Sequence, residues 1–579
     1  MVAVPARVGY NALMQSPFHL QPARPRPPLT VPAGNLLRIL ACLLLAVPAL
    51  VPAATRVTLI CIDADTGKLT PASMCLTDVE GKVRLPPDGR VLEQPSHTRD
   101  YYRGVSHDPG PEWIGPVRKM QGVGNNDDRS FVYEERPSVP WWPEPVSYLV
   151  NGRTLVELPE GGWKVAVEHG SEYLPVRETF STSGQGEKTV TLTLRRWVNL
   201  PAQGWWSGDV HVHHPTTHPS HRDFLLASAR AADVHMVNVL EMGHHQGTDF
   251  HQAGFGPAFR VRDGDYWLVS GQEDPRSDFG HIIGLNLQSM VRDLGTYDFY
   301  DVTFDGIHAQ PGALVGFAHF AWNGCALPRG FPWYVTTEDL DFVELMQFGL
   351  VNSANYYDYL NLGFRLTAAA GSDIPWGSLL GEVRTFVYCG ETLTADGWFA
   401  GLKAGRTFVS NGPALEFTAN GRRPGDVLEP AAGETLTLTA RAHSHPAMGE
   451  LESLMIIGAD GYLMETTKLA DGQRMELTAE LKVAGSGWFT ARAKCRNGAQ
   501  AHTSPVYLVV DGHPTWSSRL GPDIIAEQLR AMAAIETEFA GKNDDRTAGI
   551  RERLGKARDV YQARLKRMAQ TPADAKTSP

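Results

Sequence analysis

Strict alternation of apolar and polar residues marks several short segments early in the chain. Apolar side chains take every second position in three of them: Val57/Leu59/Cys61, Trp163/Val165/Val167 and Val190/Leu192/Leu194. Successive side chains of an extended strand point to opposite faces, so this period indicates strands with one buried face. We therefore predict an N-terminal β-sandwich over residues 55–198, interrupted by a polar, proline-rich and irregular insertion at about 99–145.

Longer apolar runs alternate with stretches compatible with helices between residues 199 and 412. The runs are 234–240, 266–269, 314–319, 342–346 and 366–370. Alternating strands and helices are typical of a parallel sheet or barrel whose functional residues collect at the carboxyl ends of the strands. The pattern predicts a central α/β barrel over residues 199–412.

Period-two alternation returns over residues 413–512, for example at Leu436/Leu438/Ala440, and predicts a C-terminal β-sandwich. In residues 513–579, apolar residues recur at helical spacing in two stretches, which predicts two amphipathic helices. The expected fold class is therefore multidomain: a central α/β barrel flanked by β-sandwich domains, with a C-terminal helical hairpin.

The first 54 residues are predicted to be a signal peptide with a long n-region. An apolar stretch at 36–51 has arginine nearby and is followed by small residues that suit a signal-peptidase site. The alternative is a membrane anchor, but Arg38 and Pro48 interrupt the run, and a spanning helix needs about 20 continuous apolar residues. We expect a secreted or periplasmic protein with no stable membrane insertion after cleavage.

Composition narrows the class of partner. The chain of 579 residues is 42% hydrophobic and 20% charged, which is ordinary for a globular protein, and its net charge is -11. Such a surface repels phosphate backbones, so nucleic acid is not expected as a partner.

The six cysteines form no C-x-x-C pair and indicate no disulfide framework. Cys61 and Cys75 could form a bridge or be two buried thiols. The oligomeric state stays open.

Histidines gather in the predicted central region. Twelve of the twenty fall between His211 and His319, and His211-Val-His213 follows an apolar, aromatic run. In an extended segment residues i and i+2 share a face, so this pair can offer two imidazoles to one cation. The triplet therefore indicates a metal site.

Further metal-ligating side chains follow or interrupt the apolar runs downstream, at Glu273, His281, His319 and Asp373. Buried carboxylates and imidazoles are costly without partners, so several meeting in one place need a cation or a dense hydrogen-bond network. We expect His211, His213, Glu273, His281, His319 and Asp373 to bind one or two divalent metal ions. Imidazole ligands suit Zn, Mn or Fe.

In this order the motifs resemble the PHP (polymerase and histidinol phosphatase) metallohydrolases, in their carbaryl hydrolase-like (CehA/McbA-like) branch, over about residues 204–412. The resemblance implies a distorted (β/α)7 barrel with one to three metals at its rim. It implies one ion on His211, His213, Glu273 and Asp373, and another on Glu273, His281 and His319. The usual third-site ligands are replaced in Leu240-Glu-Met-Gly-His244 and at Pro375, where Glu241 or His244 could substitute in part.

The resemblance and the residues together predict an exported metal-dependent hydrolase. Metal-activated water would cleave a small-molecule phosphoester or a carboxylic or carbamate ester, with Asp373 as a catalytic residue. Arg384 is a candidate for holding an anionic substrate or transition state, and its alternative is a structural ion pair. Five tryptophans near the motifs could wall a substrate pocket or be structural: Trp205, Trp206, Trp322, Trp333 and Trp376. The alternative function is a non-catalytic extracytoplasmic binding protein that retains a partial metal site.

Overall fold

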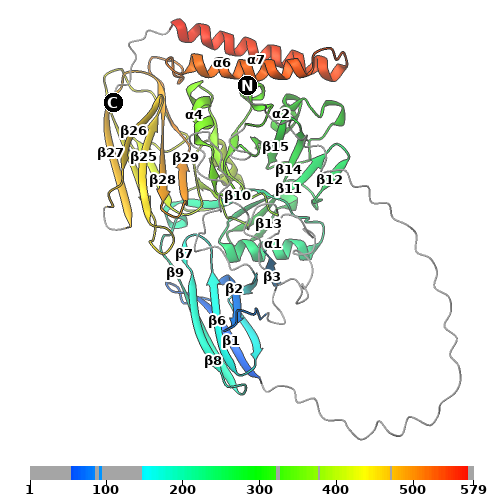
Figure 1. The fold of residues 1–579 in the computed structure, drawn as a ribbon, viewed down its shortest axis with the longest axis vertical. Coiled ribbons are helices and arrows are strands. Elements are labelled where there is room, and N and C mark those ends of the chain that lie inside the picture. The colour runs from blue at the N-terminus through cyan, green and yellow to red at the C-terminus, as the bar shows by residue number, and fades with distance from the viewer. Residues whose placement is uncertain are drawn as a thin grey trace, which may run out of the picture. The chain divides into compact units, whose positions relative to one another are not determined.

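The computed structural model describes residues 54–84, 90–93, 146–320, 327–375, 379–469 and 473–570 (Figure 1). These residues belong to one compact unit, Ala53–Pro579. The predicted signal peptide apart from its last residue, the predicted insertion at 99–145, Trp322 and Trp376 lie outside the described residues.

The N-terminal β region consists of two sheets that share one apolar core. Their strand orders are β5-β1-β9-β7 and β3-β4-β2-β6-β8. The strands are β1 Thr55–Asp63, β2 Pro71–Asp78, β3 Arg90–Glu93, β4 Val146–Asn151, β5 Arg153–Leu158, β6 Gly161–Glu168, β7 Tyr173–Leu174, β8 Val176–Thr182 and β9 Glu187–Arg196. Alternate residues of β5 are buried and exposed, as expected of a sheet with one face on the core. The arrangement is consistent with a β-sandwich. Cys61 and Cys75 are both buried and no disulfide joins them.

The central region forms a mixed sheet. Its strands are β10 Trp205–Val212, β11 Met236–His244, β12 Gly247–Asp249, β13 Val261–Asp263, β14 Tyr266–Ser277, β15 Gly280–Leu285, β16 Leu314–Phe317, β17 Phe342–Gln347, β18 Leu350–Val351, β19 Thr367–Ala370, β20 Arg384–Tyr388 and β21 Thr407–Ser410. Its helices are α1 Pro219–Ala232, α2 Tyr300–His308, α3 Phe331–Tyr334, α4 Ser353–Asn361 and α5 Ala395–Lys403. Strands β10, β16, β17 and β19 are buried along their whole length, which explains why they read as continuous apolar runs.

The predicted distorted (β/α)7 barrel over residues 199–412 is wrong. Among the strands described in this range, only two sets pair in parallel, β10-β11-β14 and β16-β17-β19. Strand β15 is antiparallel to both β14 and β16, and β20 is antiparallel to β10. A (β/α)7 barrel requires successive strands to pair in parallel, and these antiparallel pairs break that series. The core of the described chain is predominantly β, with few helices.

The large sheet continues into the C-terminal β region through the antiparallel pair β21 and β29. A separate three-stranded sheet has the order β22-β24-β27. The strands of this region are β22 Ala414–Ala419, β23 Val427–Leu428, β24 Thr435–His443, β25 Leu451–Gly458, β26 Gly461–Thr466, β27 Arg474–Lys482, β28 Gly487–Cys495, β29 Gln500–Thr503 and β30 Val506–Leu508. Both sheets contribute to one apolar cluster, which includes Leu438, Ile456 and Ala491.

Two helices end the described chain, α6 Gly521–Glu538 and α7 Asp545–Gln570, in the region where helical spacing predicts two. Their apolar residues, among them Ile525 and Leu554, join the largest apolar cluster together with residues of the central region. None of the helices in the described part of the chain has the length and apolar character that crossing a bilayer requires.

Candidate metal centre

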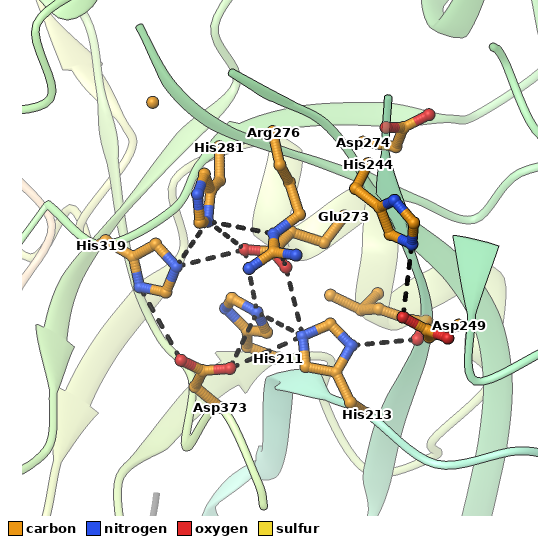
Figure 2. Close-up of polar contacts among 12 residues, drawn as sticks. His211, His213, His244, Asp249, Glu273, Asp274, Arg276, His281, His319 and Asp373 are labelled. Carbon is orange, nitrogen blue, oxygen red and sulfur yellow. Dashed lines mark hydrogen bonds and ion pairs between the residues drawn. The ribbon is translucent and has the colours of Figure 1, made fainter. Parts of the chain in front are cut away.

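The structure brings together all six side chains that the sequence predicts as metal ligands (Figure 2). They come from strand β10 and the residue after it, from β14 and β15, and from the segments that follow β16 and β19. Three overlapping groups have ligand atoms within 4.8 Å of one another: His211/His319/Asp373, His211/His213/Glu273 and Glu273/His281/His319. These buried groups could hold a metal ion.

The Nε2 atoms of His211 and His213 face each other. Nδ1 of His211 lies 2.8 Å from Oε1 of Glu344, and Nδ1 of His213 lies 3.1 Å from the carbonyl oxygen of Leu240. A proton on each Nδ1 satisfies these acceptors and leaves the Nε2 lone pairs available. The two Nε2 atoms are 3.0 Å apart. Two imidazole lone pairs that converge in this way are suited to share one cation.

Glu273 lies at the centre of the cluster. Its Oε1 is 2.8 Å from Nδ1 of His281 and 3.1 Å from Nε2 of His319. The same oxygen is 3.5 Å from Nε2 of His211, and Oε2 is 3.3 Å from Nε2 of His213. The carboxylate of Glu273 thus faces the pair His211/His213 and the pair His281/His319. A ligand that bridges two metal ions requires this arrangement.

Asp373 closes the other side of the cluster. Its Oδ1 is 3.4 Å from Nε2 of His211 and 3.5 Å from Nε2 of His213, and its Oδ2 is 3.9 Å from Nδ1 of His319. Asp373 and His319 both have left-handed backbones, with φ of 52° and 58°. Side-chain-bearing residues rarely adopt this conformation, and it is concentrated at functional sites.

The pKa shifts of the clustered side chains indicate that positive charge stabilises the cluster. Burial would lower the pKa of His211, but Glu344, Asp373 and Glu273 outweigh it and raise this pKa well above its usual value. Burial raises the pKa of Asp373, although the neighbouring histidines oppose the shift. Without a cation, the carboxylates are therefore compensated by a proton on an imidazole. The donor set of imidazoles and carboxylates is also the one that Zn, Mn and Fe prefer, so the residues fit a divalent metal.

Three buried polar residues that support the cluster escaped the sequence analysis. Glu344 in β17 contacts Nδ1 of His211 and also accepts a hydrogen bond from the backbone N of His319 at 2.7 Å. The Oε1 of Gln347 lies 2.9 Å from Nδ1 of His319. Asp209 in β10 accepts from the backbone N of His211 at 3.1 Å. A carboxylate inside an otherwise apolar strand was the signal that could have identified Glu344, because such a group must have a buried partner.

Arg276 is a further residue that sequence reasoning missed. Its Nε lies 2.9 Å from Oε2 of Glu273 and 3.3 Å from Nδ1 of His281. Burial would raise the pKa of Glu273, but Arg276, His281 and His211 outweigh it and hold this pKa well below its usual value. Burial and Arg276 together lower the pKa of His281 to about 3. Arg276 therefore keeps Glu273 ionised and His281 neutral, the forms in which both can ligate a cation.

The guanidinium of Arg384 is held by backbone carbonyls. It donates to the carbonyl oxygens of Gly381, Asp233 and Ala232 at 2.9, 3.0 and 2.6 Å. These bonds match a structural role, although the alternative foreseen from the sequence was an ion pair. Arg384 supports the chain that follows β19, since Gly381 donates in turn to Asp209.

The two candidates for a third metal site also have other partners. Glu241 accepts hydrogen bonds from Thr248 at 2.7 Å and from the backbone N of Gln252 at 3.0 Å. His244 lies 3.5 Å from Asp249, to one side of the cluster in Figure 2.

The described tryptophans among the pocket candidates are buried in apolar clusters: Trp205, Trp206 and Trp333. Trp205 packs against Tyr388 and Phe408. This packing agrees with the structural alternative for these side chains.

Comparison with known proteins identifies no family for the chain. No family model and no curated protein matches it. PsfC from Pseudomonas syringae PB-5123 is 15% identical with a TM-score of 0.24, over 34% of this chain and 88% of that chain. A β-glucosidase from Listeria innocua is 12% identical with a TM-score of 0.13, over 17% and 16%. The fibronectin(III)-like modules of CbhA from Clostridium thermocellum are 15% identical with a TM-score of 0.13, over 24% and 66%. Likenesses this weak carry no argument about function.

Proposed function

We propose that the chain is an exported metal-dependent hydrolase that cleaves a small-molecule phosphoester or a carboxylic or carbamate ester. One observation carries the proposal: imidazole nitrogens whose other ring nitrogen faces an acceptor converge on the buried carboxylate of Glu273. The ordered motifs that resemble PHP metallohydrolases support the same class of reaction. Secretion or transfer to the periplasm is part of the proposal and is based on the apolar N-terminal stretch.

The proposed division of ligands follows the overlapping groups. His211, His213, Glu273 and Asp373 would hold one divalent ion, and Glu273, His281 and His319 a second, with Zn, Mn or Fe as candidates. When bound, such ions supply Lewis-acid activation of water and polarisation of the scissile group near neutral pH.

The protein itself supplies orientation and proton acceptance. Glu344 and the carbonyl of Leu240 fix the rings of His211 and His213, so little reorganisation is needed when substrate arrives. Asp373 has one oxygen toward His211 and His213 and the other on the side of the cluster facing His319. A carboxylate placed within the cluster in this way is a suitable proton acceptor for the attacking water. We therefore assign Asp373 both to ligation and to proton acceptance.

Metal analysis and turnover test the proposal together. Purified protein should contain one or two divalent ions per chain, and it should hydrolyse at least one member of a panel of phosphoesters, carboxylic esters and carbamates. Asp373→Ala should reduce kcat by about a hundredfold or more, as loss of a positioned proton acceptor commonly does. The matched control is His513→Ala, an exposed histidine in the turn that follows β30, which should match wild type.

Two outcomes would count against the hydrolase. Bound metal without turnover on any ester would favour the alternative, a non-catalytic binding protein. The engagement of Glu241 and His244 with other partners, rather than with the cluster, favours that alternative. Protein that binds no divalent metal at all would exclude the proposed centre itself.

A further inference from the structure

Arg276 differs from the metal-ligand candidates in being a permanent cation that is partly open to solvent. It lies on β14 three residues after Glu273, and Figure 2 shows its guanidinium beside the carboxylate of that residue. Its side chain is 19% exposed, whereas that of Glu273 is 1% exposed. A molecule that approaches the cluster can therefore reach Arg276 more readily than the carboxylate it contacts.

Most of the hydrogen-bonding capacity of Arg276 is available to a ligand. Among the described residues, the polar contacts of its side chain to Glu273 and His281 are made by Nε. A guanidinium has five N–H donors, of which four belong to the two terminal amino groups. These four donors form the planar fork that matches two oxygens of a phosphate or carboxylate group.

Other arginines close to the site are engaged elsewhere. Arg384 gives all three of its nitrogens to backbone carbonyls. Arg292 contacts Asp274 at 2.6 Å and the carbonyl oxygen of His244. Within the described part of the chain, Arg276 is therefore the arginine best placed to meet a substrate at the cluster.

The net charge of the metal-loaded centre also favours binding of an anion at Arg276. In the absence of metal, Arg276 offsets the negative charge of Glu273. Two divalent ions carry four positive charges, which exceeds the three negative charges of Glu273, Asp373 and Glu344, and the remaining ligands are uncharged imidazoles. The fixed charge of Arg276 is then in excess, and a centre with excess positive charge attracts an anion.

We infer that Arg276 is a specificity-determining residue that binds negatively charged oxygens of the substrate, and that the substrate class is phosphoesters rather than neutral carboxylic or carbamate esters. This inference rests on the proposed metal centre. It assigns the choice between the two ester classes to one side chain that is not a metal ligand.

Binding of inorganic phosphate to the metal-loaded protein gives a test that does not depend on turnover. Isothermal titration calorimetry should show phosphate affinity reduced at least about tenfold in Arg276→Gln, because a charge-assisted hydrogen bond contributes about 1.5–3 kcal/mol. Arg276→Lys, which keeps the charge but loses the planar fork, should recover part of the affinity. Arg262→Gln removes an exposed arginine on β13 and should bind phosphate as wild type does.

Kinetics provide a second readout. With a phosphomonoester, Arg276→Gln should raise KM about tenfold or more and change kcat less. With a neutral carboxylic ester, the substitution should leave KM unchanged, and any change of kcat that acts through Glu273 and His281 should be the same for both substrates.

The outcomes separate this inference from the function on which it rests. Metal content of each variant is measured alongside. Metal-loaded wild type that binds no phosphate, or Arg276→Gln that binds it within twofold of wild type, overturns the inference and leaves the metal centre standing. Wild type that holds no metal overturns both.

Discussion

Asp209 illustrates how a single buried side chain can hold two parts of the candidate metal centre together. Its Oδ1 accepts hydrogen bonds from the backbone N of His211 at 3.1 Å and of Ser372 at 3.0 Å, and its Oδ2 accepts from the backbone N of Gly381 at 3.0 Å. Burial raises the pKa of Asp209 to about 6, and the hydrogen bonds from these backbone groups oppose the shift. Asp209 therefore ties β10 to the segment that carries Asp373.

We predict that Asp209→Asn weakens metal binding without removing a ligand. An amide has one acceptor oxygen, so its NH2 group would face a backbone N–H of Ser372 or Gly381 and leave it unsatisfied. The free energy of unfolding should fall by about 1–3 kcal/mol, and metal affinity by about tenfold or more. Urea unfolding and metal titration measure the two effects. Asp305→Asn, an exposed change on α2, is the control, and equal values for both variants would contradict the role assigned to Asp209.

His235 provides a pH-dependent prediction away from the metal ligands. Its ring is buried against Tyr266, at an interplanar angle of 2°, and its Nδ1 lies 2.9 Å from the hydroxyl oxygen of Ser207. Burial lowers the pKa of His235 to about 4. In the unfolded chain this pKa is about 6.5, so below pH 6.5 the unfolded state takes up a proton that the native state does not. Stability is therefore lost as pH falls from about 6.5 toward about 4.

The magnitude can be isolated by comparison with a variant that cannot titrate. Between about pH 7 and about pH 5, wild type should lose about 2 kcal/mol more unfolding free energy than His235→Gln. Urea unfolding at both pH values gives the difference. Parallel losses in the two proteins would show that the native state protonates His235 as easily as the unfolded chain does.

At the scale of single residues, the sequence predicts the metal-ligand candidates better than it predicts the buried polar residues that hold them in place. Glu273, His281 and Asp373 each follow or interrupt an apolar run, and the structure brings them together with the histidines of the first motif. Glu344 and Asp209 acquire their partners only through strand pairing between distant segments. The apolar run around Glu344 indicates that this carboxylate needs a buried partner, but nothing in the neighbouring sequence of either residue specifies which partner it has.

At the scale of elements, the metal centre depends on the close approach of β10 to the segment after β19. A Cβ added at Gly371 would collide with Oε1 of Glu344 and with the Cβ of His211. Backbone hydrogen bonds reinforce the approach, from Asp373 N to the carbonyl of His211 at 2.8 Å and from His213 N to the carbonyl of Ile374 at 2.9 Å. Residue 371 must therefore be glycine, because there is no room for a Cβ atom at this position.

We predict that Gly371→Ala displaces Glu344 or His211 and disrupts the centre. Overpacking of this kind costs about 1–3 kcal/mol, and the loss of ring orientation should lower metal affinity about tenfold or more. Gly555→Ala is the matched control, because a Cβ on this glycine of α7 meets open space and the change should be neutral or slightly stabilising. Metal titration and thermal unfolding distinguish the variants, and a Gly371→Ala protein that behaves like wild type would contradict the close approach.

The error in the predicted fold also belongs to the scale of elements. Apolar runs such as Leu314–Phe317 indicated strands, but they do not encode the direction in which neighbouring strands pair. Here β15 pairs antiparallel with both β14 and β16, so the unbroken series of parallel strands that the predicted barrel requires is interrupted. The strands of the two β regions were easier to predict, because alternation with one exposed face is a signal contained in the strand itself.

At the scale of the whole described chain, the C-terminal helices and the central region share a core. Tyr561 of α7 is buried and donates a hydrogen bond to the carbonyl of Pro332 at 2.6 Å. Ile525 and Leu554 lie in the same apolar cluster as Val343 of β17, the strand that carries Glu344. The elements around the metal centre should therefore unfold together with these helices rather than independently of them.

Metal removal should consequently lower the stability of the described chain as a whole. Glu273, Asp373 and Glu344 lie close together in the interior, and a cation that binds only the native state stabilises it by about 2.7 kcal/mol at a hundredfold excess over its Kd. Addition of a chelator should lower the midpoint of thermal unfolding, followed by the far-ultraviolet circular dichroism of strands and helices alike, and added divalent metal should restore it. In Asp373→Ala the shift should shrink, whereas in the exposed control His513→Ala it should equal that of wild type. A midpoint that does not respond to the chelator would mean that Arg276 and protonated histidines compensate the buried carboxylates without a metal, since burial in the absence of any positive charge is too costly to persist.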